Sequence, residues 1–322
     1  MKAALYRTTG SSEVLSVEDI PTPEPGAGQV RARVTLSGVN PTDWKSRSGT
    51  TGRDPDEYQV PHHDGVGVID AVGEGVSADR VGQRVWLYLA AAGNRYGTAA
   101  QYCVVPAERA VPLPGDVSDE LGASLGVPAL TAAHCLGDGP GGLAGAGVLV
   151  AGGAGAVGHF AIELAKQAGA RVVTTVSSPE KAKLAEAAGA DLVVNYRQPG
   201  AAEQIRSFAP RVDRIVEVAI GANLELDLAV SHPGTAIVVY AAEAKDPVVP
   251  TRKLMTANVA LFYILLYGVP KPQLAASVAW VSEALAAGAL SALPVHRFSL
   301  DEVAAAHDAV EGNAVGKVLV VP

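Results

Sequence analysis

A buried strand that runs into a glycine-rich turn constrains this chain more than any other part of its sequence. Residues 148–158 read Val-Leu-Val-Ala-Gly-Gly-Ala-Gly-Ala-Val-Gly and contain the pattern G-x-G-x-x-G. Apolar residues then recur at helical spacing until Gly169, so the pattern opens an amphipathic helix. This order predicts a dinucleotide site, because the turn lets a pyrophosphate approach the backbone. The residues predicted to hold the pyrophosphate are Gly153, Gly155, Ala156, Val157 and Gly158.

A second strand, Arg171–Val176, begins about 20 residues downstream, where a dinucleotide fold reads the adenosine ribose. The alternative is a turn that only packs a helix against a sheet, and that alternative does not account for the second strand. The tip of the strand carries Ser177, Ser178 and Lys181 in place of a carboxylate. Hydroxyls followed by a lysine suit a 2′-phosphate, so the sequence predicts NADPH as the cofactor. Glu180 is interpreted as a first-turn helix carboxylate that faces solvent.

Strands alternate with helices over residues 126–267, which is typical of a doubly wound parallel sheet and predicts an α/β fold. Ligands bind such sheets at the carboxyl ends of the strands, which predicts Tyr196, Val218 and Tyr240 as cofactor neighbours. The two tyrosines have the alternative of being ordinary amphipathic residues at strand ends. The predicted strands are 148–151, 171–176, 191–196, 213–219, 235–241 and 259–266.

The two ends of the chain are predicted to form one β-rich domain. Short alternating strands separated by prolines fill residues 1–125, and a helix is expected to begin near Ser118 as its N-cap. The last residues, Lys317–Val321, form an apolar strand that needs a partner in this first domain. The predicted organisation is therefore a barrel-like domain of residues 1–125 and 268–322, with a nucleotide domain of residues 126–267 inserted in it.

Composition and charge exclude several classes of function. The chain has 322 residues, 48% of them hydrophobic, a net charge of −8 and a pI near 5.4. No basic run is present to bind a nucleic acid, and the longest apolar run, residues 259–267, is too short to cross a bilayer. The amino terminus becomes polar too early for a signal peptide, so we expect a cytoplasmic protein. Cys103 and Cys135 are too few for a disulfide framework or a structural zinc site.

Several motifs along the whole chain support a more specific assignment. They are Gly-Val-Asn-Pro-Thr-Asp at 38–43, Pro-His-His-Asp-Gly-Val-Gly at 61–67, Pro-Ala-Leu-Thr-Ala at 128–132, the glycine turn, and Gly-Lys at 316–317. With these motifs the sequence resembles the medium-chain dehydrogenase/reductase superfamily, in its zinc-independent quinone oxidoreductase (zeta-crystallin-like) branch. The resemblance implies a Rossmann domain inserted in a GroES-like catalytic domain.

The resemblance also implies that the metal site of the superfamily is lost. Zinc enzymes of the superfamily carry a cysteine at the position of Asn40 and a histidine–glutamate pair at His63 and Asp64. A reductase without a Lewis acid is suited to conjugated acceptors, in which hydride arrives while charge develops on a carbonyl oxygen. The implied function is an NADPH-dependent, zinc-free reductase of a quinone or another conjugated carbonyl. The alternatives are an enoyl or 2-alkenal reductase of a dedicated pathway and a non-catalytic NADPH-binding protein.

The resemblance assigns individual residues to the site. Asn40 is implied to lie beside the nicotinamide, where its amide can bond the ribose or the substrate oxygen, and Asp43 to fix the same loop. Thr131, at the start of the helix before the glycine strand, is implied to lie near the nicotinamide carboxamide. Phe262 and Tyr263, on the last sheet strand, are implied to contact the nicotinamide and to pair subunits in a homodimer or homotetramer.

The identity of a proton donor is left open by the sequence. Relatives often carry a tyrosine shortly after Arg-Ser-Gly, and this chain has none at that position. The candidates are Tyr58, His63 and Tyr88, and each has the alternative of a wall or scaffold role.

Overall fold

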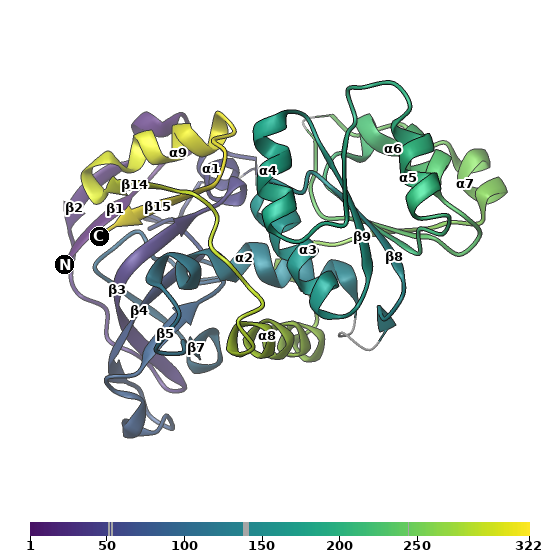
Figure 1. Ribbon diagram of the computed structural model, residues 1–322. Coiled ribbons are helices and arrows are strands. Elements are labelled where there is room, and N and C mark those ends of the chain that lie inside the picture. Colours follow the sequence, from purple (N-terminus) through teal and green to yellow (C-terminus); the bar gives the residue numbers. More distant parts are fainter. Residues whose placement is uncertain (51, 53, 138–141, 244) are drawn as a thin grey trace. The chain divides into compact units, whose positions relative to one another are not determined.

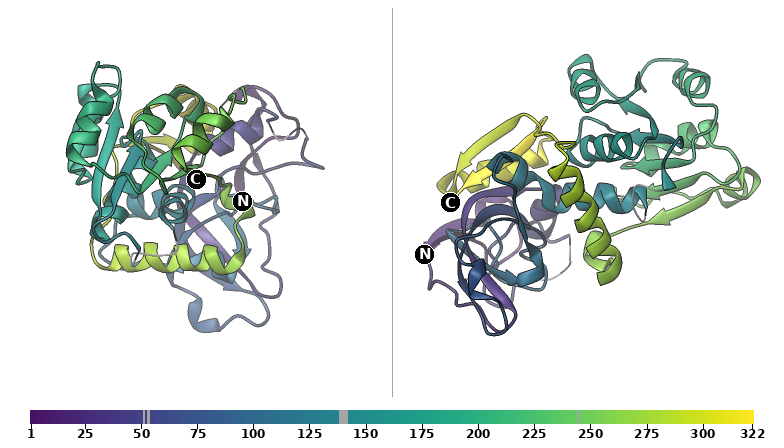
Figure 2. Two further views of the ribbon diagram at one scale, coloured as in Figure 1. Left: turned by 90° about the vertical axis from the view of Figure 1, so that its right-hand side faces the viewer. Right: turned by 60° about the horizontal axis from the view of Figure 1, so that its bottom comes forward.

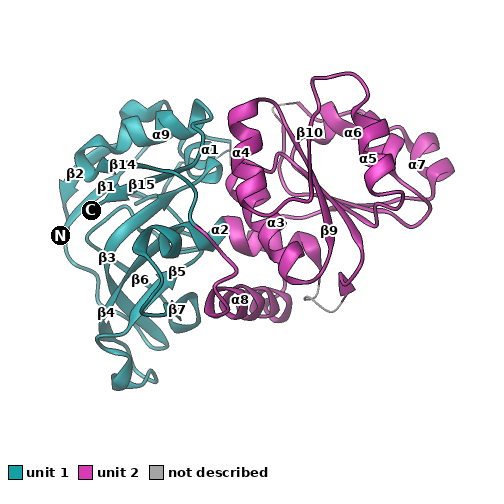
Figure 3. Ribbon diagram, viewed as in Figure 1, with its two compact units in different colours: residues 1–127, 292–322 teal, residues 128–291 magenta. Residues whose placement is uncertain are grey.

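The structure, a computed structural model, describes residues 1–50, 52, 54–137, 142–243 and 245–322 (Figure 1). The chain separates into two compact units (Figure 3). Unit 1 comprises Met1–Val127 and Ala292–Pro322, and unit 2 comprises Pro128–Ser291. Both termini lie in unit 1, and Figure 2 marks them in two further views of the chain. The α/β unit is therefore inserted within the β-rich one, which confirms the predicted fold class.

Unit 1 is built on a large sheet that, counted over the described residues, has seven strands. Six follow the order β14-β15-β3-β4-β5-β7, and β6 pairs with β3. Neighbouring strands are antiparallel except β14 and β15, which run parallel, and β1 and β2 form a separate antiparallel pair. The strands are β1 (Lys2–Leu5), β2 (Ser16–Asp19), β3 (Gln29–Val39), β4 (Asp64–Val72), β5 (Arg84–Leu87), β6 (Tyr102–Pro106), β7 (Ala110–Pro112), β14 (Val295–Ser299) and β15 (Lys317–Val321).

β3 is the central strand of this sheet because it pairs with β4, β6 and β15. Its side chains alternate, so Val30, Ala32 and Val34 enter one apolar core with residues of β4, β5 and β6. The pairing of β15 with β3 confirms that the terminal strand finds its partner in the first domain.

The helices of unit 1 begin where the sequence supplies capping groups. Ser118 caps α2, as predicted, because its hydroxyl accepts a hydrogen bond from Leu121 N at 3.2 Å. The helix α2 (Asp119–Leu136) continues from unit 1 into unit 2. The others are α1 (Pro41–Arg47), α9 (Val303–Glu311) and the 3₁₀ turns η1 (Ser12–Val14), η2 (Ala78–Arg80), η3 (Ala107–Arg109) and η6 (Leu300–Glu302).

Unit 2 contains a parallel sheet of six strands, counted over the described residues, in the order β10-β9-β8-β11-β12-β13. This order is that of two mononucleotide-binding halves meeting between β8 and β11. The strand β9 has its predicted bounds, whereas β13 is shorter and ends before Ile264. The strands are β8 (Gly147–Ala151), β9 (Arg171–Val176), β10 (Leu192–Asn195), β11 (Arg214–Glu217), β12 (Ala236–Val239) and β13 (Ala260–Tyr263).

Helices line this sheet (Figure 1). One apolar core joins α5 and α6 to the strands through Ile205, Leu224 and Ile215, among others. None of the helices formed by the described residues combines the length and apolarity needed to cross a membrane. The helices are α3 (Ala156–Gln167), α4 (Pro179–Ala187), α5 (Ala201–Phe208), α6 (Ile220–Val230), α7 (Thr251–Ala257), α8 (Lys271–Ala286) and the 3₁₀ turn η5 (Leu266–Gly268).

The second boundary between the units differs from the expected one. We expected residues 268–322 to join the first domain, but unit 2 extends to Ser291 and includes α8. The reason is the contact of α8 with α3, where Trp280 Nε1 donates a hydrogen bond to Gln167 Oε1 at 3.1 Å. The first boundary, after Val127, lies close to the expected residue 125.

Candidate functional site

The glycine turn of unit 2 is shaped by close backbone approaches. The amides of Gly152 and Gly153 both donate to Thr175 O, at 3.1 and 3.2 Å, which ties the turn to β9. A Cβ at Gly153 would lie 2.1 Å from Thr174 Oγ1, and one at Gly158 would lie 2.4 Å from Gly152 O. Both distances are far below van der Waals contact, so these two positions accept only glycine.

The turn leaves the amino end of α3 open to an anion. Gly155 is the N-cap, and the bond from His159 N to Gly155 O, at 2.8 Å, is the first of the helix. The amides of Ala156, Val157 and Gly158 precede that bond, so they point out of the helix end with its positive dipole. This arrangement fits the pyrophosphate of a dinucleotide.

The tip between β9 and α4 holds the three residues predicted to read the ribose. Ser177, Ser178 and Lys181 are all half-buried, whereas Glu180 is exposed, as interpreted from the sequence. Ser178 is also the N-cap of α4, because its hydroxyl accepts a hydrogen bond from Lys181 N at 3.3 Å. That hydroxyl keeps its proton for an incoming acceptor, so the cap does not conflict with phosphate binding.

Other predicted cofactor neighbours lie at the same edge of the sheet. Tyr196, Val218 and Tyr240 directly follow β10, β11 and β12, and the carboxyl ends of parallel strands share one edge. Thr131 differs from expectation, since it is buried in the second half of α2 and does not begin a helix. The helix starts twelve residues earlier because Ser118 caps it there.

The last strand of the sheet, β13, pairs with β12 on one side and forms an edge. Its Phe262 and Tyr263 side chains are 53% and 60% exposed. Large apolar side chains on an edge strand form a surface suited to pairing with another chain.

Unit 1 contains a buried polar cluster around Asn40. Asn40 Nδ2 donates to Asp64 Oδ2 at 2.6 Å, and Lys317 Nζ donates to Asn40 Oδ1 at 2.7 Å. Lys317 Nζ also lies 3.7 Å from Asp64 Oδ2. Asp43 Oδ2 accepts from Asn40 N at 2.7 Å, which fixes the start of α1 as expected for the loop. These four side chains are at most 3% exposed.

Electrostatics within this cluster are dominated by burial. Loss of water raises the pKa of Asp43 well above its usual value, and the charge of Asp64 raises it further. Burial also raises the pKa of Asp64 and lowers that of Lys317, while the two charges stabilise each other. Sequence reasoning gave Asp64 and Lys317 no role beyond their motifs. The only signal for Lys317 was a charged residue at the start of an apolar strand.

The candidate proton donors do not gather around Asn40 in one arrangement. His63 is buried beside Asp64 in the chain, and burial lowers its pKa to about 3, so its imidazole is neutral at pH 7. The Tyr58 ring packs edge to face with Tyr96, and the Arg95 guanidinium lies 5.0 Å from its centroid. The Tyr88 hydroxyl donates a hydrogen bond to Glu108 O at 3.1 Å. Tyr58 and Tyr88 thus contact the scaffold.

The residues at the position of the superfamily's zinc do not suit that ion. Zinc prefers thiolate, imidazole and carboxylate ligands. Asn40 supplies a neutral amide, and its oxygen already accepts a hydrogen bond from the Lys317 ammonium group. That ammonium would repel a divalent cation bound beside Asp64. Within the described parts of the chain, no group of three or more histidine, cysteine or acidic side chains is arranged to hold a metal.

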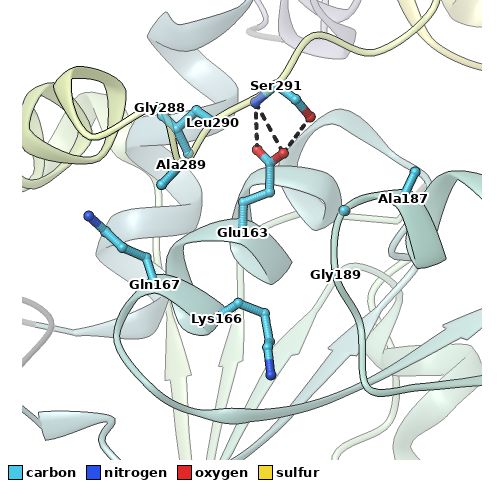
Figure 4. Close-up of a pocket in the computed structure, with 10 residues that line it drawn as sticks. Glu163, Lys166, Gln167, Ala187, Gly189, Gly288, Ala289, Leu290 and Ser291 are labelled. Carbon is cyan, nitrogen blue, oxygen red and sulfur yellow. Dashed lines mark hydrogen bonds between the residues drawn. The ribbon is translucent and has the colours of Figure 1, made fainter.

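A shallow recess lies beside the carboxyl half of α3, between α4 and residues 288–291 (Figure 4). There Glu163 accepts hydrogen bonds from Ser291 N at 3.1 Å and from Ser291 Oγ at 2.5 Å. His159 Nε2 lies 3.2 Å from both Ser291 Oγ and Glu163 Oε1. In a catalytic triad the serine and the carboxylate contact different ring nitrogens of the histidine, whereas here both are near Nε2. These hydrogen bonds therefore hold Ser291 in place and do not make it a nucleophile.

Comparison with known proteins identifies the family. An alcohol dehydrogenase GroES-like domain matches residues 26–115, and a zinc-binding dehydrogenase domain matches residues 156–283. The quinone oxidoreductase of Lama guanicoe is 30% identical over 99% of this chain and 97% of its own length.

Solved structures agree over the full chain. A mycobacterial quinone oxidoreductase is 31% identical, with a TM-score of 0.86 and coverage of 100% of both chains. A mycobacterial structure complexed with NADPH is 30% identical, with the same TM-score of 0.86 and the same coverage of 100%. This chain is therefore an oxidoreductase of the medium-chain dehydrogenase/reductase superfamily and belongs to its quinone oxidoreductase branch.

Proposed function

We propose that this protein is an NADPH-dependent reductase of quinones or other conjugated carbonyls that works without zinc. The observation that carries the proposal is the anion-binding helix end at Gly155–Gly158, followed one strand later by a tip with two hydroxyls and a lysine. The mycobacterial relative that binds NADPH, aligned over the whole chain, supports the choice of cofactor.

The residues of unit 2 would bind the cofactor by its anionic groups. The amides of Ala156, Val157 and Gly158 hold the pyrophosphate, and Gly153 lets the turn pack closely against Thr174 of β9. Ser177, Ser178 and Lys181 bind the 2′-phosphate through charge-assisted hydrogen bonds. Tyr196, Val218, Tyr240 and Thr131 would line the remainder, and Phe262 and Tyr263 would approach the nicotinamide by their backbone.

The catalytic help would come from hydrogen bonds in a site without a metal. Bound NADPH supplies hydride to the conjugated acceptor. Asn40 would donate a hydrogen bond to the acceptor's carbonyl oxygen, where negative charge develops. Asp43 would hold the Asn40 backbone, and His63 would be a neutral wall. The poor match of Asn40, Asp64 and Lys317 to zinc supports the metal-free form of the reaction.

The test is a panel of acceptors, with NADPH oxidation followed for several quinones and several acyclic enones before and after dialysis against a chelator. We expect quinone-dependent oxidation at rates that the chelator does not change. Faster turnover of acyclic enones would reassign the substrate class to the enone reductases. Oxidation by none of the acceptors would contradict the proposal, and loss of activity on chelation would contradict its metal-free form.

We further propose that the protein forms a homodimer or homotetramer through the β13 edge. Phe262 and Tyr263 support this, since both are exposed on a strand that, among the described residues, pairs on one side only.

A further inference from the structure

The position of Lys317 is set by strand pairing in unit 1. Val318 of β15 pairs with Val39 of β3, so Lys317 lies opposite Asn40, which follows β3. Gly38 of β3 pairs with Asp64 of β4. Two strand pairings therefore bring together three side chains that are far apart in the sequence.

Gly38 makes room for the backbone of α2 and, less closely, for the side chains of Asp64 and Lys317. A Cβ at this position would lie 3.2 Å from Lys317 Cε, 3.1 Å from Asp64 Cβ and 2.2 Å from Ala123 O. The aliphatic part of Lys317 thus passes close over the glycine to reach the cluster, and its ammonium group ends 2.7 Å from Asn40 Oδ1. The fold delivers this charge into an interior where Lys317 is 2% exposed.

The contacts fix the orientation of the Asn40 amide. An ammonium group only donates, so the amide oxygen must face Lys317. The Asp64 Oδ2 atom accepts from Asn40 Nδ2, and Asp64 Oδ1 accepts from Val127 N at 2.7 Å. The amide therefore has no second orientation, and among the residues that the structure describes only one of its two Nδ2 hydrogens has an acceptor.

The charges on either side act on the amide in the same sense. A cation at the oxygen and an anion at the nitrogen both favour the charge-separated resonance form of an amide. In that form the nitrogen carries more positive character, so its remaining hydrogen is a stronger donor. A low local dielectric strengthens the effect of both charges.

We propose that Lys317 is a positioning residue that acts through Asn40, holding and polarising its amide as a hydrogen-bond donor to the substrate oxygen. Lys317 thereby supplies, from within the chain, a positive charge next to the position that zinc takes in other members of the superfamily. The proposal rests on the proposed function, because it concerns the same reduction and the same donor.

The test is a double-mutant cycle of wild type, Lys317→Met, Asn40→Ala and the double variant. We measure kcat and KM for a quinone, the Kd for NADPH, and the thermal unfolding midpoint of each. Lys2→Met, a substitution of an exposed lysine on β1, is the control for removal of a positive charge. Lys317→Arg keeps the positive charge on a side chain of different length and tests whether that charge retains part of kcat.

We expect Lys317→Met to lower kcat about 10- to 100-fold, less than the about 100- to 1,000-fold loss on removing a preorganised donor outright. KM and the NADPH Kd should stay within about threefold. Because Lys317 acts through Asn40, the double variant should be no slower than Asn40→Ala. If Lys317→Met does not fold, the same four proteins are made with Asp64→Asn, which removes the unpaired buried carboxylate.

Other outcomes overturn the inference in distinguishable ways. An active wild type whose kcat is unchanged by the Lys317 substitution would reduce Lys317 to a structural role. Multiplicative losses in the double variant would show that Lys317 does not act through Asn40. If the wild type oxidises NADPH with none of the quinones or enones tested, the proposed function is overturned, and the inference with it.

Discussion

His307 donates a hydrogen bond from Nε2 to Nε2 of His62, across 3.0 Å in the interior of unit 1. The direction follows from the rest of the network. Thr98 Oγ1 must donate to Asp64 O, so Ser37 Oγ donates to Thr98, and His62 Nδ1 donates to Ser37. Neutral His62 then accepts at Nε2, which requires the proton of His307 to be on its Nε2.

This network makes the protein sensitive to acid. Burial lowers the pKa of His307 to about 3, and burial together with the nearby His307 lowers that of His62 well below 6.5. As the pH falls below about 6.5, the unfolded chain binds protons that the folded chain does not, so the free energy of unfolding decreases. We expect the unfolding midpoint of wild type to drop more between pH 7 and pH 5 than that of His307→Gln.

The matched control for this prediction is His296→Gln, since His296 is exposed. The control should show the same drop between pH 7 and pH 5 as wild type. An equal drop in His307→Gln and wild type would mean that the buried pair does not titrate as described.

A carboxyl pair in unit 2 has the opposite pH dependence. Asp227 and Glu217 are buried side by side, and burial, with the charge of Glu217, raises the pKa of Asp227 to about 9. The folded chain therefore retains a proton that the unfolded chain releases near pH 4, and stability falls as the pH rises toward 9. Asp227→Asn, which keeps a donor at this place, should raise the unfolding midpoint at pH 8 by about 2–4 °C.

The control for that substitution is Glu225→Gln, on the exposed side of the same helix, which should leave the midpoint unchanged. A lower midpoint for Asp227→Asn at pH 8 would show that Glu217 and Asp227 do not share a proton.

Lys181 should determine the preference for NADPH. Its ammonium group is proposed to bind the 2′-phosphate, and a charge-assisted hydrogen bond of about 1.5–3 kcal/mol corresponds to about 10- to 100-fold in Kd. Lys181→Ala should weaken NADPH binding by that factor and leave NADH unchanged, as measured by fluorescence titration. Lys183→Ala, exposed on the same helix, is the control. Equal losses for both cofactors would place recognition of the phosphate elsewhere.

The β13 edge should control assembly. Size-exclusion chromatography with light scattering is expected to give the mass of a dimer or tetramer for wild type. Tyr263→Glu places a charge on the proposed interface and should shift the protein toward monomer, whereas Val81→Glu, at a 49% exposed site in unit 1, should not. A monomeric wild type would contradict the proposal.

Local patterns were enough to predict the core of unit 2. β8 is a continuous apolar run, β9 consists of β-branched residues after Arg171, and the glycines between β8 and α3 have the spacing of a dinucleotide-binding turn. Thr131 shows where local patterns fail. We expected it at the start of a helix, but α2 begins at Asp119, so Thr131 lies in the second half of that helix.

Long-range contacts were beyond the sequence. Lys317 and Asn40 are 277 positions apart, and no pattern indicates that a charged residue at the start of an apolar strand turns inward. The place of α8 was equally hidden, because nothing in the sequence indicates that Trp280 meets Gln167. A resemblance supplied the role of Asn40, while the partners of its amide became visible only in the folded chain.

The most direct test is a titration of the purified protein with NADPH and with NADH, followed by addition of 1,4-benzoquinone to the same cuvette. The account predicts tighter binding of NADPH than of NADH, and rapid loss of the nicotinamide absorbance once the quinone is added. Binding of neither cofactor, or NADPH binding that no quinone or enone converts into oxidation, would contradict it.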